Sequence, residues 1–268
     1  MAISNKSLNG VSAKRSVSEA KLTRSGVSSA LIWRGPSAFD EQPIMAVVTG
    51  LDGSSENPKT GPMAQLWIQR SDIHPIEAVQ SRGDYSICSD CKLRGSGLQR
   101  PCYVKLEAPT SIYNKFRRGG YQELTPTQVN AMLRQSGRGI RLGAYGDPVA
   151  CPIEVIRELV EGVRFTGYTH QWASPLKTGW RSLLMASCDS PLERLEASKR
   201  GWRTFRVRLA DESLMAAEIA CPASDEAGHR TICQKCGLCD GARANDRRKD
   251  IAIIVHGVQK AQFMEIQR

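Results

Sequence analysis

Two groups of cysteines constrain this chain more than any other feature of its sequence. Seven of the nine cysteines fall into a triplet, spaced C-x2-C-x10-C, and a quartet, spaced C-P-x10-C-x2-C-x2-C. The triplet is Cys88, Cys91 and Cys102, and the quartet is Cys221, Cys233, Cys236 and Cys239. Thiolates separated by two residues can converge on one metal ion or cluster without straining the backbone. Both groups therefore predict metal binding.

The N-terminal residues 1–28 are basic and rich in serine, and they contain no apolar stretch. They are therefore predicted to form a disordered tail and not a secretory signal. No run of about 18 apolar residues is present, so no membrane partner is expected. These features favour the cytoplasm, where clustered cysteines are usually metal ligands. The alternative is a secreted protein with disulfide bonds.

The net charge of +10 predicts an anionic partner, such as nucleic acid or a nucleotide. Basic residues are dense in the tail and again beside the quartet, at Arg243, Arg247, Arg248 and Lys249. The alternative is ordinary solvated surface charge. Aromatic residues make up 6% of the chain and are scattered, so the sequence shows no base-stacking platform. It also contains no Walker A, H-E-x-x-H or G-x-S-x-G motif.

Strand-like apolar runs alternate with helical segments along most of the chain. The expected strands are 44–50, 64–70, 84–88, 140–145, 165–170, 183–187, 202–208, 215–221 and 251–257. The expected helices are 75–81, 109–118, 126–135, 152–163 and 191–201, with starts at Thr125-Pro126 and Ser190-Pro191. This alternation predicts an α/β fold with a mostly parallel sheet, arranged as a partial or complete βα barrel. We expect one metal-binding domain, 29–268, with a cysteine-rich insertion at 221–250.

Polar, thiol and imidazole groups, with two glycines, recur where the expected strands end. They are Cys88, Gly143, Gly146, Asp147, Thr169, His170, Cys188, Asp189, Cys221 and His256. In parallel α/β folds, ligands bind at the carboxyl ends of the strands. If the sheet curls, these groups face one rim, and the triplet and quartet lie on the same side. The alternative for each residue is a structural role, such as a hydrogen-bonded histidine or a buried thiol.

The cysteine spacing also bears on which metal is bound. Zinc sites with four cysteines commonly use two C-x2-C pairs. The quartet instead combines C-x2-C-x2-C with the remote Cys221-Pro222, which is closer to ferredoxin ligand runs. The quartet therefore favours a [4Fe–4S] cluster, with zinc as the alternative. Three triplet thiolates on a [4Fe–4S] cluster would leave one iron open to another ligand.

The triplet beside the aromatic Tyr103, on an expected βα barrel, resembles the radical S-adenosylmethionine enzymes. The segment RLGAYGDP (141–148) is similar to the glycine-rich strand near the methionine end of the cofactor in that superfamily. The resemblance implies one or two [4Fe–4S] clusters and S-adenosylmethionine as cofactors. Its implied pocket residues are Gly143, Gly146, Asp147 and His170. The usual cysteine spacing of the superfamily is C-x3-C-x2-C, which differs from the triplet.

Residues 34–257 also resemble an uncharacterised family of phage and plasmid proteins. The resemblance is carried by GPSAFD (35–40), KTG (59–61), CSDC (88–91), RLGAYGDP (141–148), GYTHQW (167–172), ASCDS (186–190), CPASDEAGHRTICQKCGLCDG (221–241) and VHG (255–257). It implies the cytoplasm of a bacterial host and assigns no reaction. The expected function is an iron–sulfur, radical-SAM-like enzyme acting on a nucleotide or nucleic acid. The alternative is a zinc-stabilised, non-catalytic nucleic-acid-binding protein.

Overall fold

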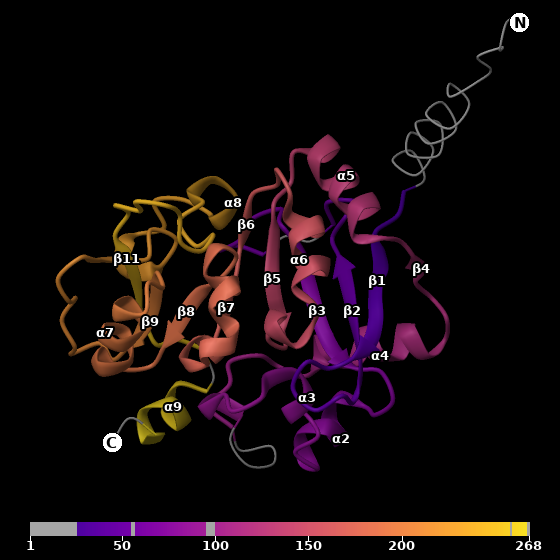
Figure 1. Ribbon diagram of the computed structural model, residues 1–268, viewed down its shortest axis with the longest axis horizontal. Coiled ribbons are helices and arrows are strands. Elements are labelled where there is room, and N and C mark those ends of the chain that lie inside the picture. The colour runs from indigo at the N-terminus through magenta and orange to yellow at the C-terminus, as the bar shows by residue number, and fades with distance from the viewer. Residues whose placement is uncertain (1–25, 55–56, 95–99, 258, 267–268) are drawn as a thin grey trace, which may run out of the picture.

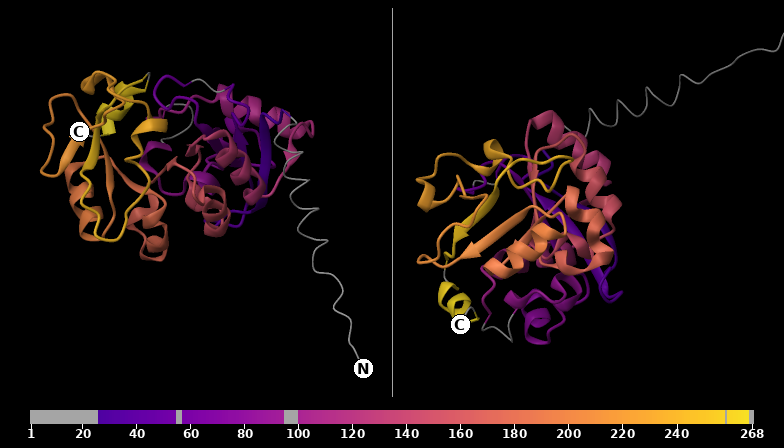
Figure 2. Two further views of the ribbon diagram at one scale, coloured as in Figure 1. Left: turned by 90° about the horizontal axis from the view of Figure 1, so that it is seen from above. Right: turned by 60° about the vertical axis from the view of Figure 1, so that its left-hand side comes forward.

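The computed structural model describes residues 26–54, 57–94, 100–257 and 259–266, which form two β-sheets flanked by helices (Figure 1). The first sheet contains β1 (Ser29–Pro36), β2 (Pro43–Thr49), β3 (Ala64–Arg70), β4 (Gln122–Glu123), β5 (Ile140–Tyr145) and β6 (Phe165–Thr166). The second contains β7 (Tyr168–Thr169), β8 (Met185–Cys188), β9 (Thr204–Arg208), β10 (Glu218–Ala220) and β11 (Asp250–Ile254). Figure 2 shows the two sheets beside each other.

The predicted α/β fold is confirmed, and most strand pairs are parallel. The first sheet has the order β4-β1-β2-β3-β5-β6, and the second has the order β10-β11-β9-β8-β7. All pairs in the second sheet are parallel, as are β3–β5 and β5–β6. The expected strand at 44–50 is β2, and it is antiparallel to both of its neighbours, β1 and β3. The strand β1 was not among the expected strands.

Helices cover both faces of the first sheet. The helices are α2 (Pro75–Gln80), α3 (Tyr85–Cys88), α4 (Glu107–Arg117), α5 (Pro126–Ser136), α6 (Ile153–Val160), α7 (Pro191–Lys199), α8 (Cys233–Cys236) and α9 (Lys260–Ile266). On one face α5 and α6 bury the main apolar core against β1, β2 and β3. On the other face α4 packs Ile112 and Tyr113 against Leu31, Met45 and Val47.

Local sequence signals set the helix starts as predicted. Thr125 caps α5 by accepting from the Gln128 backbone N–H, and Gln128 returns a bond to the Thr125 N–H. Ser190 caps α7 by accepting from the Glu193 backbone N–H, with proline at the first helical position. The expected strand at 84–88 is wrong, because Asp84 begins the single helical turn α3 instead.

The predicted tail, 1–28, lies mostly outside the described residues. Of its last three residues, Val27 packs against the main core, and the Ser28 carbonyl accepts from the Leu51 N–H at 3.0 Å. The chain is therefore packed against the first sheet before residue 29. Among the described residues, no helix has the length and apolar character needed to cross a membrane.

The two sheets meet at Gly167, the one residue between β6 and β7. Its N–H donates to the Cys239 carbonyl, and its carbonyl accepts from the Met185 N–H, both at 3.0 Å. A Cβ on Gly167 would lie 2.5 Å from Leu184 Cδ2 and 3.0 Å from Leu142 Cβ. This residue therefore lets a strand change sheets where the backbone is closely packed.

We expect Gly167→Ala to lower the free energy of unfolding by about 1–3 kcal/mol, because its methyl group would overlap two buried leucines. Urea denaturation of the purified protein measures this directly. Gly179→Ala is the matched control, since the nearest atom to its Cβ would be 3.7 Å away. Equal stability of the two variants would contradict a close-packed sheet junction at Gly167.

Candidate metal centres

The triplet loop begins at the end of α3 and is held by a buried ion pair. Arg94 donates to the Asp84 carboxylate from Nε at 3.1 Å and from Nη2 at 2.8 Å. Its Nη1 donates to the Ser89 carbonyl at 2.7 Å. The Asp147 N–H donates to the Ile87 carbonyl at 2.6 Å, which ties the loop to the carboxyl end of β5. Protein contacts alone therefore hold the start of the triplet loop against the parallel strands.

The three triplet thiols lie close enough to influence one another electrostatically. Burial raises the pKa of Cys88 well above its usual value, and the Cys91 and Cys102 thiolates raise it further. The Cys102 N–H donates to the Leu93 carbonyl at 2.9 Å and closes the loop. Cys91 and Cys102 pack beside Leu93 and Val255, the residue that follows β11. The three predicted ligands thus lie in one region near the carboxyl ends of the strands, with Cys88 against the main core and the other two beside Val255.

Asp147 joins the ends of β5 and β7. Its Oδ1 accepts from the Val149 N–H at 3.0 Å. Its Oδ2 accepts from the Thr169 hydroxyl at 2.8 Å and from the His170 N–H at 3.1 Å. Both oxygens of this buried carboxyl therefore have protein partners, Oδ2 positions the His170 backbone, and direct contact with a cofactor stays a prediction.

Gly143 and Gly146 allow the turn after β5 to pack tightly. Both have positive φ angles, of 67° and 76°. A Cβ on Gly146 would lie 2.6 Å from the Ile68 carbonyl oxygen on β3, and one on Gly143 would lie 2.8 Å from the Gly146 carbonyl oxygen. Close backbone packing requires glycine at both positions, while their predicted role in a cofactor pocket stays a prediction.

His170 and Asp189 follow β7 and β8 and lie beside the triplet. The His170 Nε2 is 3.5 Å from the Asp189 Oδ2, and the Asp189 side chain is only 2% exposed. Burial favours the neutral imidazole, but the Cys91 thiolate and Asp189 outweigh it and raise the pKa of His170 well above its usual value. The two strand ends therefore place a cation-forming side chain against the triplet.

Several buried polar atoms around the triplet have no hydrogen-bond partner among the described residues. They include the Tyr145 Oη and the Asp189 Oδ1, whereas the His170 Nε2 and the Asp189 Oδ2 face each other as an ion pair at 3.5 Å. Tyr145 lies near the triplet. Burial raises the pKa of its hydroxyl, and the negative charge of the Cys88 thiolate raises it further. More than about 90% of buried polar groups in proteins are hydrogen-bonded. The Tyr145 Oη and the Asp189 Oδ1 are therefore free to bond a further group.

The four quartet cysteines line one small cavity to which both sheets contribute. The cavity measures about 20 Å³ and is also lined by Lys59 from the loop before β3, Tyr168 from β7 and Ile251 from β11. A space of roughly 10–15 Å³ holds one water molecule. The cavity therefore has room for a single ion with the side chains as they stand, and a larger cluster needs the thiols to move apart.

Residues that precede β3 and β5 hold α8, the helix that carries two of the quartet cysteines. The Cys233 N–H donates to the Lys59 carbonyl at 2.9 Å, and the Gln234 N–H donates to the Thr60 carbonyl at 3.1 Å. The Gln234 Oε1 accepts from the Gly139 N–H at 2.8 Å. The KTG segment thus serves as a platform for the quartet.

Cations surround the quartet. Burial raises the pKa of Cys233, while the positive charges of Lys59 and Arg141 lower it. Arg164 has the same lowering effect on the pKa of Cys236 and donates to the carbonyl of Lys235 at 3.0 Å. A centre with four thiolate ligands carries net negative charge, which nearby cations stabilise.

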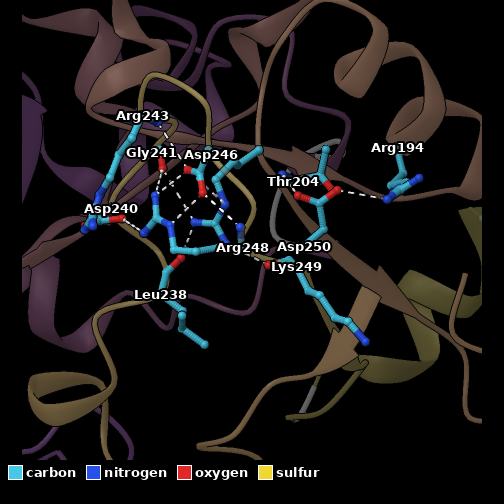
Figure 3. Close-up of polar contacts among 11 residues, drawn as sticks. Arg194, Thr204, Leu238, Asp240, Gly241, Arg243, Asp246, Arg248, Lys249 and Asp250 are labelled. Atoms are coloured by element: carbon cyan, nitrogen blue, oxygen red, sulfur yellow. Dashed lines mark hydrogen bonds and ion pairs between the residues drawn. The ribbon is translucent and has the colours of Figure 1, made fainter. Parts of the chain in front are cut away.

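A polar network fixes the chain after the last quartet cysteine (Figure 3). Arg203 donates to the Leu238 carbonyl, and Arg248 donates to both Asp240 and Asp246. The Arg248 Nε lies 2.9 Å from the Asp246 Oδ1. These bonds hold the end of the quartet loop against β9 independently of the thiols.

The same network reduces the predicted basic patch beside the quartet. Arg243 is paired with Asp240, and Arg248 is paired with Asp240 and Asp246. Arg247 and Lys249 remain exposed cations of the patch. Two of the four predicted charges are therefore neutralised locally, which weakens this segment as a binding surface for an anionic partner.

We expect the Asp246 network to make stability depend on acid pH. Hydrogen bonds from Arg248 hold the pKa of Asp246 well below its ordinary value of 3.8. The unfolded chain therefore takes up this proton first as the pH falls, so the stabilisation is complete above that value and is lost below it. Asp246→Asn should be less stable at neutral pH and should lose less stability between about pH 5 and pH 2. Urea denaturation at several pH values tests this, with the exposed Asp211→Asn as the charge control, and parallel curves would contradict it.

The two cysteine sites face the same side of the second sheet but lie at different positions along its strands. Val207 packs against both of the apolar clusters that contain quartet and triplet cysteines. The quartet cavity is lined by Tyr168 and Ile251, at the starts of β7 and β11, whereas His170 and Val255, beyond the ends of these strands, lie at the triplet. The expectation of one shared rim is therefore wrong for the quartet. The reason is that β10 pairs only with the first three residues of β11, so Cys221, the next residue, lies before the end of β11.

The remaining candidates are structural or exposed. Cys151 and Cys188 are buried in the main core, and His256 is an exposed residue. All nine cysteines are free thiols. In the part of the chain that is described, no three cysteine, histidine or carboxylate side chains already surround one point closely enough to bind a metal ion.

Sequence reasoning missed two side chains on the strand β5. Tyr145 lies at the triplet, and Arg141 lies near the quartet, where its Nη2 donates to the Tyr103 hydroxyl at 2.6 Å. Tyr103 directly follows a triplet cysteine, so this bond spans the space between the two sites. Both missed residues belong to the RLGAYGDP segment. Residues four apart on a strand point to the same face, and this spacing was the signal that could have identified them.

Comparisons with known proteins assign no family to the chain. No protein-family model, no curated protein and no solved structure matched it.

Proposed function

We propose that this chain is an iron–sulfur protein with two centres, an open one at the triplet and a closed one at the quartet, and that it is a radical-SAM-like enzyme. The observation that carries the proposal is a buried His170–Asp189 ion pair beside three thiols, together with two buried polar atoms, the Tyr145 Oη and the Asp189 Oδ1, that have no hydrogen-bond partner among the described residues. Buried polar atoms are costly unless a partner completes them. A bound cluster and its exogenous ligand are such partners.

The order of the strands supports the proposal. Across the two sheets, neighbouring parallel strands follow the order of the chain. The order is β3, β5 and β6 in the first sheet, continued by β7, β8, β9 and β11 in the second. This is the order of a partial βα barrel, and the triplet loop follows the first of these strands. Closure into a barrel is part of the proposal, and so are the phage or plasmid origin and the bacterial cytoplasm.

The proposed roles of the triplet residues follow from their positions. The three thiolates would bind a [4Fe–4S] cluster that leaves one iron open, and S-adenosylmethionine bound there would supply one-electron chemistry. Asp147 positions the His170 backbone, while Asp189 holds the imidazole beside Cys91. A nucleotide or nucleic acid is the proposed substrate class, because the chain carries a net charge of +10.

The alternative is a zinc-stabilised nucleic-acid-binding protein without catalysis. The size of the quartet cavity favours this alternative, since its volume of about 20 Å³ suits one ion. Zinc with four thiolates would be a structural site closed to other ligands. The unpaired atoms at the triplet are not explained by this alternative.

Metal analysis after anaerobic purification separates the two proposals. The iron–sulfur proposal expects a brown protein with about eight iron atoms per chain, an equal amount of sulfide, and broad visible absorbance that changes when S-adenosylmethionine is added. The zinc alternative expects a colourless protein with stoichiometric zinc that reconstitution with iron and sulfide does not change. That result would contradict the iron–sulfur proposal.

A further inference from the structure

A second cavity lies at the edge of the first sheet that is farthest from the cysteines. It measures about 330 Å³ and is lined by Arg34 on β1, by Phe116 and Arg117 at the end of α4, and by Tyr121 and Glu123 at β4. In Figure 1 this edge, formed by β4 and β1, lies opposite the second sheet. A volume of roughly 300 Å³ is enough for a small organic ligand.

A bulge in β1 brings Arg34 to this cavity. The pairing of β1 with β2 shifts register between Leu31 and Trp33. Ile32 and Trp33 then both pack on the main core, while Leu31 and Arg34 line the cavity on the opposite face. Bulges commonly redirect a side chain at the edge of a sheet. An unbroken strand would have turned Arg34 toward the core.

Two aromatic rings supply the apolar walls. Phe116 and Tyr121 rest against the smaller core formed by α4 and β2, and each keeps a partly exposed surface. The Lys115 ammonium lies 4.6 Å from the centroid of the Tyr121 ring and also donates to the Ser29 hydroxyl at 2.8 Å. These contacts hold Tyr121 in place, so the cavity offers fixed aromatic surfaces.

The rim of the cavity is cationic. Arg34 and Arg117 are exposed, and among the described residues neither forms an ion pair. Arg117 is held with its guanidinium 6.0 Å from the centroid of the Tyr113 ring. Glu123 is the one carboxylate of the lining, so the two arginines leave the cavity with a net positive charge.

We propose that this cavity binds single-stranded nucleic acid, with one base against Phe116 and Tyr121 and the flanking phosphates on Arg34 and Arg117. Flat aromatic surfaces stack any base, and cations track the backbone on either side. Because the cavity lies at the open edge of the sheet, a nucleic-acid chain bound there can extend beyond it in both directions. The inference goes beyond the proposed function, because it requires no metal at the cysteines.

The test is binding of a fluorescein-labelled oligothymidylate of about 12 nucleotides, followed by anisotropy with the full chain between about 50 and 200 mM salt. We expect the exposed double variant Arg34→Gln/Arg117→Gln to bind more weakly and to lower the salt slope by about 1.4, since each phosphate contact on a single strand contributes about 0.7. The matched control is Arg134→Gln/Arg157→Gln, which removes the same charge from exposed positions on α5 and α6. It should keep both the affinity and the slope.

The double variant Phe116→Leu/Tyr121→Leu separates stacking from charge. It should weaken binding about tenfold or more and leave the salt slope unchanged. Unchanged affinity in this variant, or equal binding of heparin, would overturn the proposal in favour of a general anion patch. Displacement of the strand by micromolar thymidine monophosphate would overturn it in favour of a free-nucleotide site.

Metal content is measured on the same preparations. Wild-type iron or zinc in both pocket variants, together with lost binding, supports the cavity proposal whichever metal the cysteines hold. Binding that depends on the cysteines and not on the pocket residues would overturn it. The outcome is therefore distinguishable from success or failure of the iron–sulfur proposal.

Discussion

Serine at all three triplet positions is expected to remove about four iron atoms per chain, with little loss of folding stability. The triplet loop is held without its thiols by the Arg94–Asp84 ion pair and by the bond from the Asp147 N–H to the Ile87 carbonyl. The fold should therefore survive while the open centre is lost. Iron, sulfide and visible absorbance are measured after anaerobic reconstitution, and urea denaturation follows on the same samples. Any response of the absorbance to S-adenosylmethionine should disappear.

Serine at the four quartet positions should behave differently. The quartet cavity is lined from both sheets, and its loop joins β10 to β11. A metal there would add a link between both sheets and the quartet loop, and structural metal sites can contribute about 10 kcal/mol or more to folding. We expect this variant to lose its metal and also to lose several kcal/mol of unfolding free energy.

The matched control replaces the two cysteines outside both groups, Cys151→Ala/Cys188→Ala. Both thiols are buried in the main core and lie away from the quartet cavity. This variant should keep its full metal content and lose only about 1 kcal/mol per site. Equal loss of iron in the triplet variant and in this control would contradict the assignment of the triplet as a centre.

Local patterns in the sequence predicted the features that depend on neighbouring residues. The caps at Thr125 and Ser190 and the strand–helix alternation after residue 140 agree with the structure. These features are set by bonds between residues a few positions apart. The presence of His170 beside Cys91 also followed from a local rule, since ligands gather where parallel strands end.

Features that depend on pairing across the sheet were not predictable from local pattern. The antiparallel pairing of β2 and the short register of β10 on β11 are set by distant partners. Because of the short register of β10 on β11, the quartet does not lie at the predicted rim. The aromatic residues Phe116 and Tyr121 looked scattered in the sequence, yet α4 and β4 bring them to one cavity.

Glu218→Gln is expected to lower the free energy of unfolding by about 3–5 kcal/mol, the cost of leaving one partner of a buried ion pair alone. The Glu218 carboxylate accepts from the Arg206 Nε and Nη2, both at 2.8 Å, and both side chains are 0% exposed. Burial works against the charged carboxylate, but the bonds from Arg206 outweigh it and lower the pKa of Glu218. The amide keeps the shape of the side chain and removes its charge, so the Arg206 cation remains inside the sheet without its closest counter-charge.

The double variant Arg206→Met/Glu218→Leu decides whether the charge itself is required. Apolar residues of similar volume often replace a buried ion pair at little cost, so this variant should recover to within about 1 kcal/mol of the wild type. Urea denaturation of both single variants and the double variant completes the thermodynamic cycle. Because Glu218 begins β10 and Cys221 follows its end, Glu218→Gln should also weaken metal binding at the quartet, and the double variant should restore it. Stability that recovers without restored metal binding would show that the ion pair, and not only the packing of β10, positions Cys221.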